Sequence, residues 1–254
     1  MAGPEQIRAY LLEMAATLGD SREMAIFGEG NISGRLADDT FLVKASGVGL
    51  ASLREEHLVE VERKPLVAVI EQDGAIRDEE VEQLLLDARR DRQALKPSVE
   101  SLFHAWLLGL PDVHFVGHTH AIAVNQILCS PRARDFATKR LIPDQIVYCG
   151  AESVLVPYVD PGLMLARTIA REVEAFIKRT GVVPRTILME NHGIIALGKR
   201  HTDVIAALGM AEKAARIFVG AAVLGGPIFM SGGHVRRIEG RVDEHYRRRM
   251  LQQT

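Results

Sequence analysis

Apolar and polar residues recur along the chain with the spacings of helices and strands. Over residues 5–19, apolar side chains return every three or four positions, which predicts an amphipathic helix. The same spacing predicts helices over residues 78–92, 121–130, 163–180 and 203–224, and a helical C-terminal tail from about residue 230.

Short runs rich in β-branched and aromatic residues predict strands between these helices. They cover residues 40–46, 57–61, 65–71, 113–120, 145–149, 153–159 and both sides of a turn within 186–198. Strand pairs joined by turns at Asp73–Gly74 and near Asn191–Gly193 argue against a purely parallel sheet. We therefore expect one α/β domain over residues 1–254, with three α/β/α layers around a central mixed, largely antiparallel sheet.

Composition and charge exclude several classes of protein. The 254 residues are 47% hydrophobic, and 31 basic residues face 33 acidic ones, so no nucleic-acid partner is expected. No apolar run reaches the roughly 18 residues that a membrane span needs, and the first residues carry no secretion signal. Cys129 and Cys149 form no metal or disulfide pattern. These features predict a cytoplasmic protein with no membrane partner.

Two histidines in one predicted strand are the first candidates for chemistry. His118 and His120 are two positions apart, so both side chains point to the same face of the strand. Two imidazoles placed in this way can bind one metal ion at about 2.0–2.1 Å each. The alternative is a pair of structural histidines, which would be costly to bury without partners.

A third histidine and a glutamate extend this candidate site. His192 lies in the turn Asn191–Gly193, where an ordinary turn role is the alternative to metal binding. Glu100 lies in the first turn of a helix for which Ser98 is the expected N-cap, and there it could also simply stabilise the helix dipole. Three protein ligands with one open position are typical of a catalytic metal site.

A glycine-rich segment suggests that an anion is bound. Residues 28–34 read Gly-Glu-Gly-Asn-Ile-Ser-Gly, and we interpret them as a turn whose backbone N–H groups can hold a phosphate. They match neither the dinucleotide-binding fingerprint nor the P-loop. Ser46, Gly47 and Ser98 offer further hydroxyl and N–H donors.

The order of these motifs resembles the class II aldolase/adducin family. The resemblance runs over roughly residues 5–225, through Gly30-Asn31-Ile32-Ser33, Ser46-Gly47, Pro97-Ser98-Val99-Glu100, His118-Thr119-His120, Pro157-Tyr158 and Asn191-His192-Gly193. It implies a class II aldolase-like fold and a zinc-dependent lyase that cleaves a small ketose phosphate reversibly through a metal-stabilised enediolate.

The resemblance also implies roles for individual residues. His118, His120 and His192 would bind Zn²⁺ or another divalent metal. Glu100 would be a fourth ligand at rest and the proton carrier during turnover. Tyr158 would act in the active site of a neighbouring subunit, within a homotetramer whose sites lie between subunits. The substrate phosphate would be bound by Asn31, Ser46, Gly47 and Ser98.

One departure from the family pattern leaves the reaction open. Val99 stands where the fuculose-1-phosphate aldolases have a second serine, so one hydroxyl donor to the phosphate is lost. An epimerase, a dehydratase or a decarboxylase acting on a related sugar phosphate or keto acid could use the same metal site. A non-enzymatic module like adducin is a remote alternative, because all three histidines and Glu100 are present.

Overall fold

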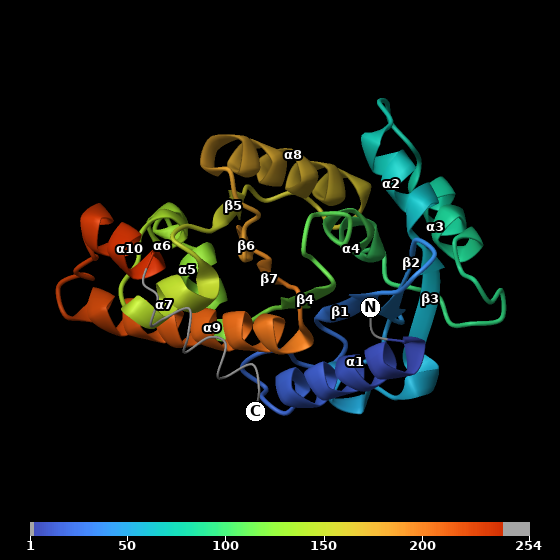
Figure 1. Ribbon diagram of the computed structural model, residues 1–254, viewed down its shortest axis with the longest axis horizontal. Helices are drawn as coiled ribbons and strands as arrows, with labels where there is room; N and C mark the ends of the chain where they lie inside the picture. The colour runs from blue at the N-terminus through green and yellow to red at the C-terminus, as the bar shows by residue number, and fades with distance from the viewer. Residues whose placement is uncertain (1–2, 241–254) are drawn as a thin grey trace.

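A seven-stranded sheet runs through the centre of the protein (Figure 1). The computed structural model describes residues 3–240, and the strand order is β3-β2-β1-β4-β7-β6-β5. Only β5 and β6 are parallel, and every other neighbouring pair is antiparallel. The predicted mixed, largely antiparallel sheet is therefore confirmed.

The strands are short and most of their residues are buried. Their bounds are β1 Asn31–Arg35, β2 Thr40–Lys44, β3 Leu58–Glu62, β4 Phe115–Thr119, β5 Val154–Val156, β6 Thr186–Met189 and β7 Gly193–Gly198. The helices that cover the sheet are α1 Pro4–Gly19, α2 Arg63–Glu71, α3 Asp78–Asp87, α4 Ser101–Leu107, α5 Ile122–Leu128, α6 Ala133–Thr138, α7 Pro143–Cys149, α8 Leu163–Thr180, α9 His201–Val223 and α10 Gly232–Glu239. Two 3₁₀ turns, Leu50–Ser52 and Glu55–His57, precede β3.

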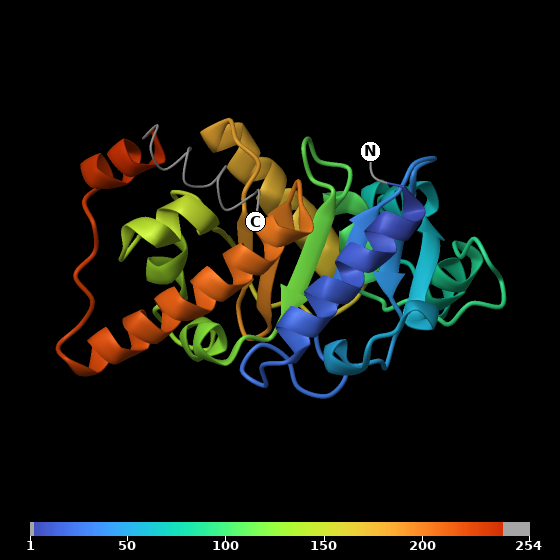
Figure 2. The same cartoon turned by 60° about the horizontal axis from the view of Figure 1, so that its bottom comes forward.

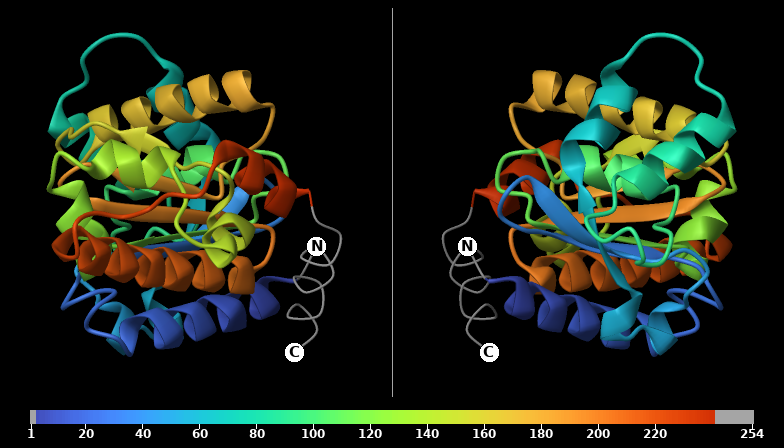
Figure 3. Two further views of the ribbon diagram at one scale, coloured as in Figure 1. Left: turned by 90° about the vertical axis from the view of Figure 1, so that its left-hand side faces the viewer. Right: turned by 90° about the vertical axis from the view of Figure 1, so that its right-hand side faces the viewer.

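Helices cover both faces of the sheet, as Figure 3 shows in its two end-on views. On one face, α1 and α9 lie side by side (Figure 2) and pack with α5 and α6 against side chains such as Ile32 and Ile194. On the other face, α2, α3, α4 and α8 pack against side chains such as Val43 and Ile195. Because neighbouring residues of a strand point to opposite faces, every strand except β1 contributes apolar side chains to both cores, and β1 contributes only Ile32, on the α1 and α9 side.

Two segments predicted as strands are helices in the structure. Residues 65–71 belong to α2, which buries Leu66, Val69 and Ile70 at helical spacing, so the predicted hairpin at Asp73–Gly74 does not form. Residues 145–149 belong to α7, which begins at Pro143. Short apolar runs fit either period, and packing against neighbouring helices decides between them.

The glycine-rich segment is also more ordered than predicted. The turn expected over residues 28–34 ends at Gly30, and Asn31–Arg35 form β1 in the middle of the sheet, between β2 and β4. At the other end of the chain, α10 covers Gly232–Glu239, and the rest of the predicted helical tail lies outside the described residues. Within residues 3–240, no helix is both long and apolar enough to cross a membrane.

Candidate metal centre

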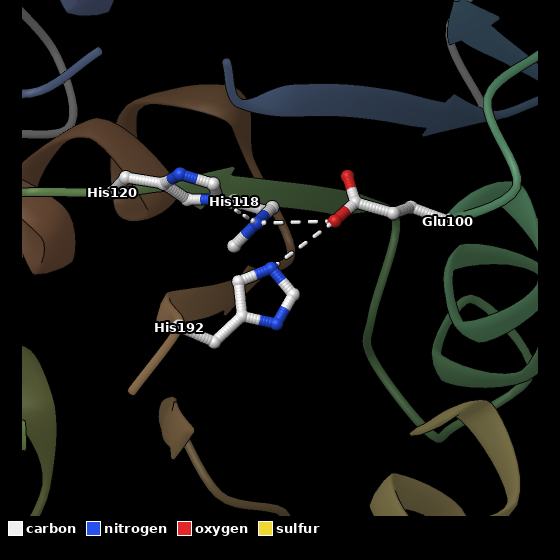
Figure 4. Close-up of side chains that lie close together, drawn as sticks. All are labelled: Glu100, His118, His120 and His192. Atoms are coloured by element: carbon white, nitrogen blue, oxygen red, sulfur yellow. Dashed lines mark hydrogen bonds and ion pairs between the residues drawn. The ribbon is translucent and has the colours of Figure 1, made fainter. Parts of the chain in front are cut away.

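Four side chains converge at one end of the sheet (Figure 4). Glu100, His118, His120 and His192 each present one nitrogen or oxygen atom, and these four atoms lie within 4.8 Å of one another. His118 Nε2 lies 3.0 Å from His120 Nε2 and 3.4 Å from Glu100 Oε1, which is also 3.4 Å from His192 Nε2. The four residues that the sequence singled out as candidate ligands are thus brought together.

Each of these residues lies at the end of an element. His118 is in β4 and His120 directly follows that strand, so both lie at the C-terminal end of β4. His192 lies in the turn from β6 to β7, and Glu100 is the N-cap residue of α4. Because β4 and β7 are antiparallel neighbours, the end of β4 meets the start of β7.

The turn that carries His192 is fixed by α5. Asn125 of that helix donates a hydrogen bond from Nδ2 to the carbonyl oxygen of His192 at 2.9 Å. The N–H of Asn191 donates to the carbonyl oxygen of Leu128, and Asn191 has a φ of 54°, which asparagine tolerates better than most residues. The helix that follows the first two histidines therefore also positions the third.

The donor set fits a divalent metal ion. Ligand bonds of about 2.0–2.1 Å in a tetrahedral site place neighbouring nitrogens roughly 3.3 Å apart, close to the spacings in the cluster. His118 Nδ1 lies 3.0 Å from the carbonyl oxygen of Ile194, which can only accept a hydrogen bond. The proton of this imidazole is therefore on Nδ1, and Nε2 keeps its lone pair for a metal.

The four clustered side chains change one another's pKa values. Burial raises the pKa of the Glu100 carboxyl, but the charges and hydrogen bonds of His118 and His192 outweigh burial and place that pKa well below its usual value. Burial lowers the pKa of His118, and the Glu100 carboxylate more than compensates, so the net shift is upward. Burial and the two other histidines lower the pKa of His120 to about 4. Glu100 is thus ionised and His120 neutral at pH 7, and a metal ion bound at His118 Nε2 would compete with the proton that Glu100 favours there.

The residues expected to bind phosphate differ in burial and in hydrogen bonding. Asn31 faces His118 across the β1–β4 pairing and is fully buried, and in the described part of the chain neither atom of its side-chain amide has a hydrogen-bond partner. Ser46 and Gly47 are exposed in the turn after β2. Within residues 3–240, the N–H groups of Gly47 and Val48 donate to no protein acceptor. An unpaired buried amide and free N–H groups are what a polar ligand would satisfy.

Ser98 has a different position from the one predicted. It is not the N-cap of α4, which begins at Ser101, although its Oγ accepts a hydrogen bond from the N–H of Glu100 at 3.3 Å. Val99 packs against the core on the α4 side of the sheet. Ser98 therefore fixes the backbone of Glu100, which carries one of the four clustered side chains.

Tyr158 is not part of the cluster in this chain. Its side chain is exposed and its hydroxyl donates to Asp160 at 2.9 Å. That carboxylate raises the pKa of Tyr158. Across residues 3–240, no hydrogen bond joins Tyr158 to the four clustered side chains.

Two charged residues near the centre, Lys44 and Glu29, were not predicted from the sequence. The Lys44 ammonium is buried and donates to the carbonyl oxygens of Val48 at 2.5 Å and of Gly28 and Ala45 at 3.4 Å. Burial lowers the pKa of Lys44, and Glu100 opposes that shift. Glu29 Oε1 lies 3.7 Å from His120 Nδ1. The available signal was a lysine inside an apolar strand, and a glutamate between two glycines.

A fourth histidine lies behind the site. His104 is fully buried one turn after Glu100, and its Nδ1 is 2.6 Å from Ser33 Oγ. Burial lowers its pKa to about 3, so this histidine is neutral. The contact connects α4, which carries Glu100, with β1, which carries Asn31.

Two relatives of known sequence match most of the chain. A Bacillus subtilis (strain 168) protein, the uncharacterized oxidoreductase YuxG, is 30% identical over 190 residues, which cover 72% of this chain and 25% of that protein. This chain therefore matches about a quarter of the length of the Bacillus protein. The methylthioribulose-1-phosphate dehydratase of Geobacillus kaustophilus (strain HTA426) is 26% identical over 196 residues, covering 74% of this chain and 80% of the dehydratase.

Solved structures share the fold. An L-fuculose 1-phosphate aldolase superposes with a TM-score of 0.70 at 16% identity and covers 94% of this chain and 96% of its own. The L-fuculose-1-phosphate aldolase from Thermus thermophilus gives 0.62 at 18% identity, covering 88% of this chain and 99% of its own. Residues 10–219 match the family described as the Class II Aldolase and Adducin N-terminal domain, and the chain therefore belongs to that family.

Proposed function

We propose that this protein is a zinc-dependent lyase that cleaves a small ketose phosphate by a reversible aldol reaction. The observation that carries the proposal is the convergence of three imidazole Nε2 atoms and the Glu100 carboxylate at one end of the sheet. His118, His120 and His192 would hold the ion, with Glu100 as a fourth ligand at rest. A divalent ion bound there acts as a Lewis acid on the oxygen atoms of the substrate.

The protein's own groups would bind the substrate and move protons. Aldol cleavage breaks the bond between the carbon next to the carbonyl and the carbon that bears a hydroxyl group. Tyr158 of a neighbouring subunit would accept the proton of that hydroxyl as the aldehyde leaves. Glu100 would deliver a proton to the carbon that loses its bond, and solvent would return to Glu100 the proton that Tyr158 took up, so that the cycle closes; in synthesis Glu100 would remove the same proton from carbon.

The anionic end of the substrate would be bound beside the metal centre. The unpaired amide of Asn31 and the free N–H of Gly47 support this placement, with Ser46 and Ser98 as hydroxyl donors. The buried ammonium of Lys44 adds a positive charge beneath these loops. In this proposal these donors would have to compensate for the hydroxyl that Val99 lacks.

A dehydratase is the second candidate. The match to the Geobacillus dehydratase covers most of both chains, and removal of water next to a carbonyl needs the same Lewis acid and the same carboxylate base. Epimerase and decarboxylase reactions would use the same residues. An adducin-like module without activity would not need the three histidines with Glu100.

The proposal includes the domain organisation of the chain and its oligomeric state. We propose one class II aldolase-like domain over residues 1–254 with a C-terminal helical tail, in a cytoplasmic homotetramer. The exposed Tyr158 supports inter-subunit sites, because among residues 3–240 its hydroxyl forms a hydrogen bond only with Asp160 and leaves the clustered side chains without a tyrosine.

Metal analysis and a substrate screen test the proposal. Purified protein should contain about one divalent ion per chain, and added Zn²⁺ or another divalent ion should support cleavage of at least one ketose phosphate, detected by mass spectrometry. The Glu100→Gln variant should keep its fold and lose turnover. Absence of bound metal together with absence of activity after addition of divalent ions would reject the enzyme proposal. Water loss in place of carbon–carbon cleavage would favour the dehydratase.

A further inference from the structure

The three candidate histidine ligands differ in what their second ring nitrogen contacts. Nδ1 of His118 is hydrogen-bonded to the carbonyl oxygen of Ile194, and Nδ1 of His192 is buried with no hydrogen-bond partner among residues 3–240. Nδ1 of His120 faces a carboxylate, because Glu29 Oε1 lies 3.7 Å away. His120 is therefore the only one of the three whose outer nitrogen faces an acidic side chain.

The carboxylate of Glu29 is held in place by its own loop. Glu29 Oε2 accepts a hydrogen bond from the N–H of Ile26 at 2.9 Å, and the N–H of Glu29 donates to the carbonyl oxygen of Ile26 at 3.1 Å. One oxygen is thus anchored, and the other is directed toward His120. A closure of less than about 1 Å would convert the contact with His120 Nδ1 into a hydrogen bond of ordinary length.

Gly30 allows this loop to approach the histidines. Its φ is +76°, and a Cβ atom there would lie 2.9 Å from the carbonyl oxygen of His118 and 3.0 Å from Leu50 Cδ1. Any larger residue would push the loop away from the end of β4. The glycine therefore keeps Glu29 next to His120.

We propose that Glu29 is a positioning residue for the metal centre, and that it accepts a hydrogen bond from His120 Nδ1–H. This contact fixes the tautomer that leaves His120 Nε2 free for the ion, orients the ring, and makes Nε2 more basic. The inference rests on the proposed metal site. It assigns Glu29 no contact with the ion or the substrate.

The affinity of the metal for Glu29 variants tests this role. Zn²⁺ affinity is measured by competition with a chromophoric chelator, and the visible spectrum of the Co²⁺-loaded protein reports the geometry of the ligands. Glu29→Ala should weaken Zn²⁺ binding by about 10- to 100-fold and change the Co²⁺ spectrum. Glu29→Gln keeps an acceptor oxygen without the charge, so its loss of affinity should exceed twofold and be smaller than that of Glu29→Ala.

A second glutamate–histidine pair provides the control. Glu13 Oε2 lies 3.0 Å from His201 Nε2, outside the metal centre. Glu13→Gln should leave Zn²⁺ affinity and the Co²⁺ spectrum unchanged. Thermal unfolding of the metal-free proteins shows whether Glu29→Ala still folds. If Glu29→Ala does not fold, the Zn²⁺ affinity of Glu29→Gln alone decides whether Glu29 has the proposed role.

The outcomes separate this inference from the proposed function. If wild-type protein binds Zn²⁺ tightly and the folded Glu29 variants match it within twofold, the role of Glu29 is overturned and the metal site stands. A loss in the Glu29 variants no greater than that in Glu13→Gln also overturns it. If the wild-type protein binds no divalent ion, it is the proposed function that fails.

Discussion

Gly193 lies so close to Thr119 that no side chain fits between them. A Cβ atom at Gly193 would be 2.5 Å from the carbonyl oxygen of Thr119, and 3.0 Å from the rings of both His118 and His120. The close approach brings the turn that carries His192 against the end of β4. A residue without a side chain is therefore a structural requirement of the metal centre.

Substitution of this glycine should disrupt the site. Gly193→Ala forces the backbone of the turn away from β4, so we expect a loss of stability of about 1–3 kcal/mol and a weaker metal site. Gly209→Ala is the matched control, because Gly209 lies within α9 and a Cβ atom there meets no atom of the described residues within 4 Å. Alanine at that position should stabilise the helix by roughly 0.5–1 kcal/mol. Chemical denaturation and metal titration of both variants measure the difference, and equal behaviour would contradict the expectation.

Lys44 should matter for the anionic end of the substrate. Its buried ammonium binds carbonyl oxygens on both loops of the proposed anion site, so Lys44→Met removes a charge and loosens both loops. We expect the KM of a phosphorylated substrate to rise about tenfold, equivalent to about 1.4 kcal/mol, with a smaller effect on an unphosphorylated analogue. Lys96→Met, at a surface residue paired with Glu82, should change neither value. Equal effects on both substrates in the Lys44 variant would argue against a charge role.

His104 should make the stability of the fold depend on pH. In the folded protein burial lowers its pKa to about 3, while the unfolded chain has the ordinary value of 6.5. Above pH 6.5 the His104 side chain is neutral in both the folded and the unfolded protein, so its ionisation does not change the free energy of unfolding. As the pH falls from 6.5 toward 3, only the unfolded state gains the proton, so folding is weakened by up to about 1.4 kcal/mol per pH unit.

The measurement is the free energy of unfolding across that range for the wild type and His104→Gln, both kept free of metal by a chelator. The glutamine variant should be less stable at pH 7, because the contact with Ser33 is altered, and should lose stability less steeply below pH 6.5. Parallel curves for the two proteins would rule out the contribution of His104.

Tyr158 should act on a neighbouring copy of the chain. Tyr158→Phe removes the hydroxyl that would move the aldehyde proton, so kcat should fall by about 10²–10⁴-fold while the metal content stays the same. Mixed oligomers of Tyr158→Phe and Glu100→Gln chains should regain activity, because some sites then combine an intact Glu100 with an intact Tyr158 from another subunit. Mixtures that remain inactive, although the subunits exchange, would place Tyr158 outside the shared site.

Local patterns were enough to predict much of the fold. The long helices α1, α8 and α9 follow from helical spacing sustained over many residues, which leaves little ambiguity. The segments around 65–71 and 145–149 were predicted wrongly, because short apolar runs satisfy both helical and strand spacing. Which spacing is used there depends on the neighbouring elements.

By itself, the sequence determined which residues are candidates for the metal centre. Two histidines at strand spacing, a histidine in a turn and a glutamate near a helix start are local features that also allow structural roles, and only their order along the chain, which matches a family pattern, favoured metal binding. The tertiary structure decided that these side chains meet, since β4, β7 and α4 come together only in the folded sheet. It alone placed the Lys44 charge beneath the loops and Glu29 beside His120, because the direction of a loop side chain depends on contacts with residues far away in the chain.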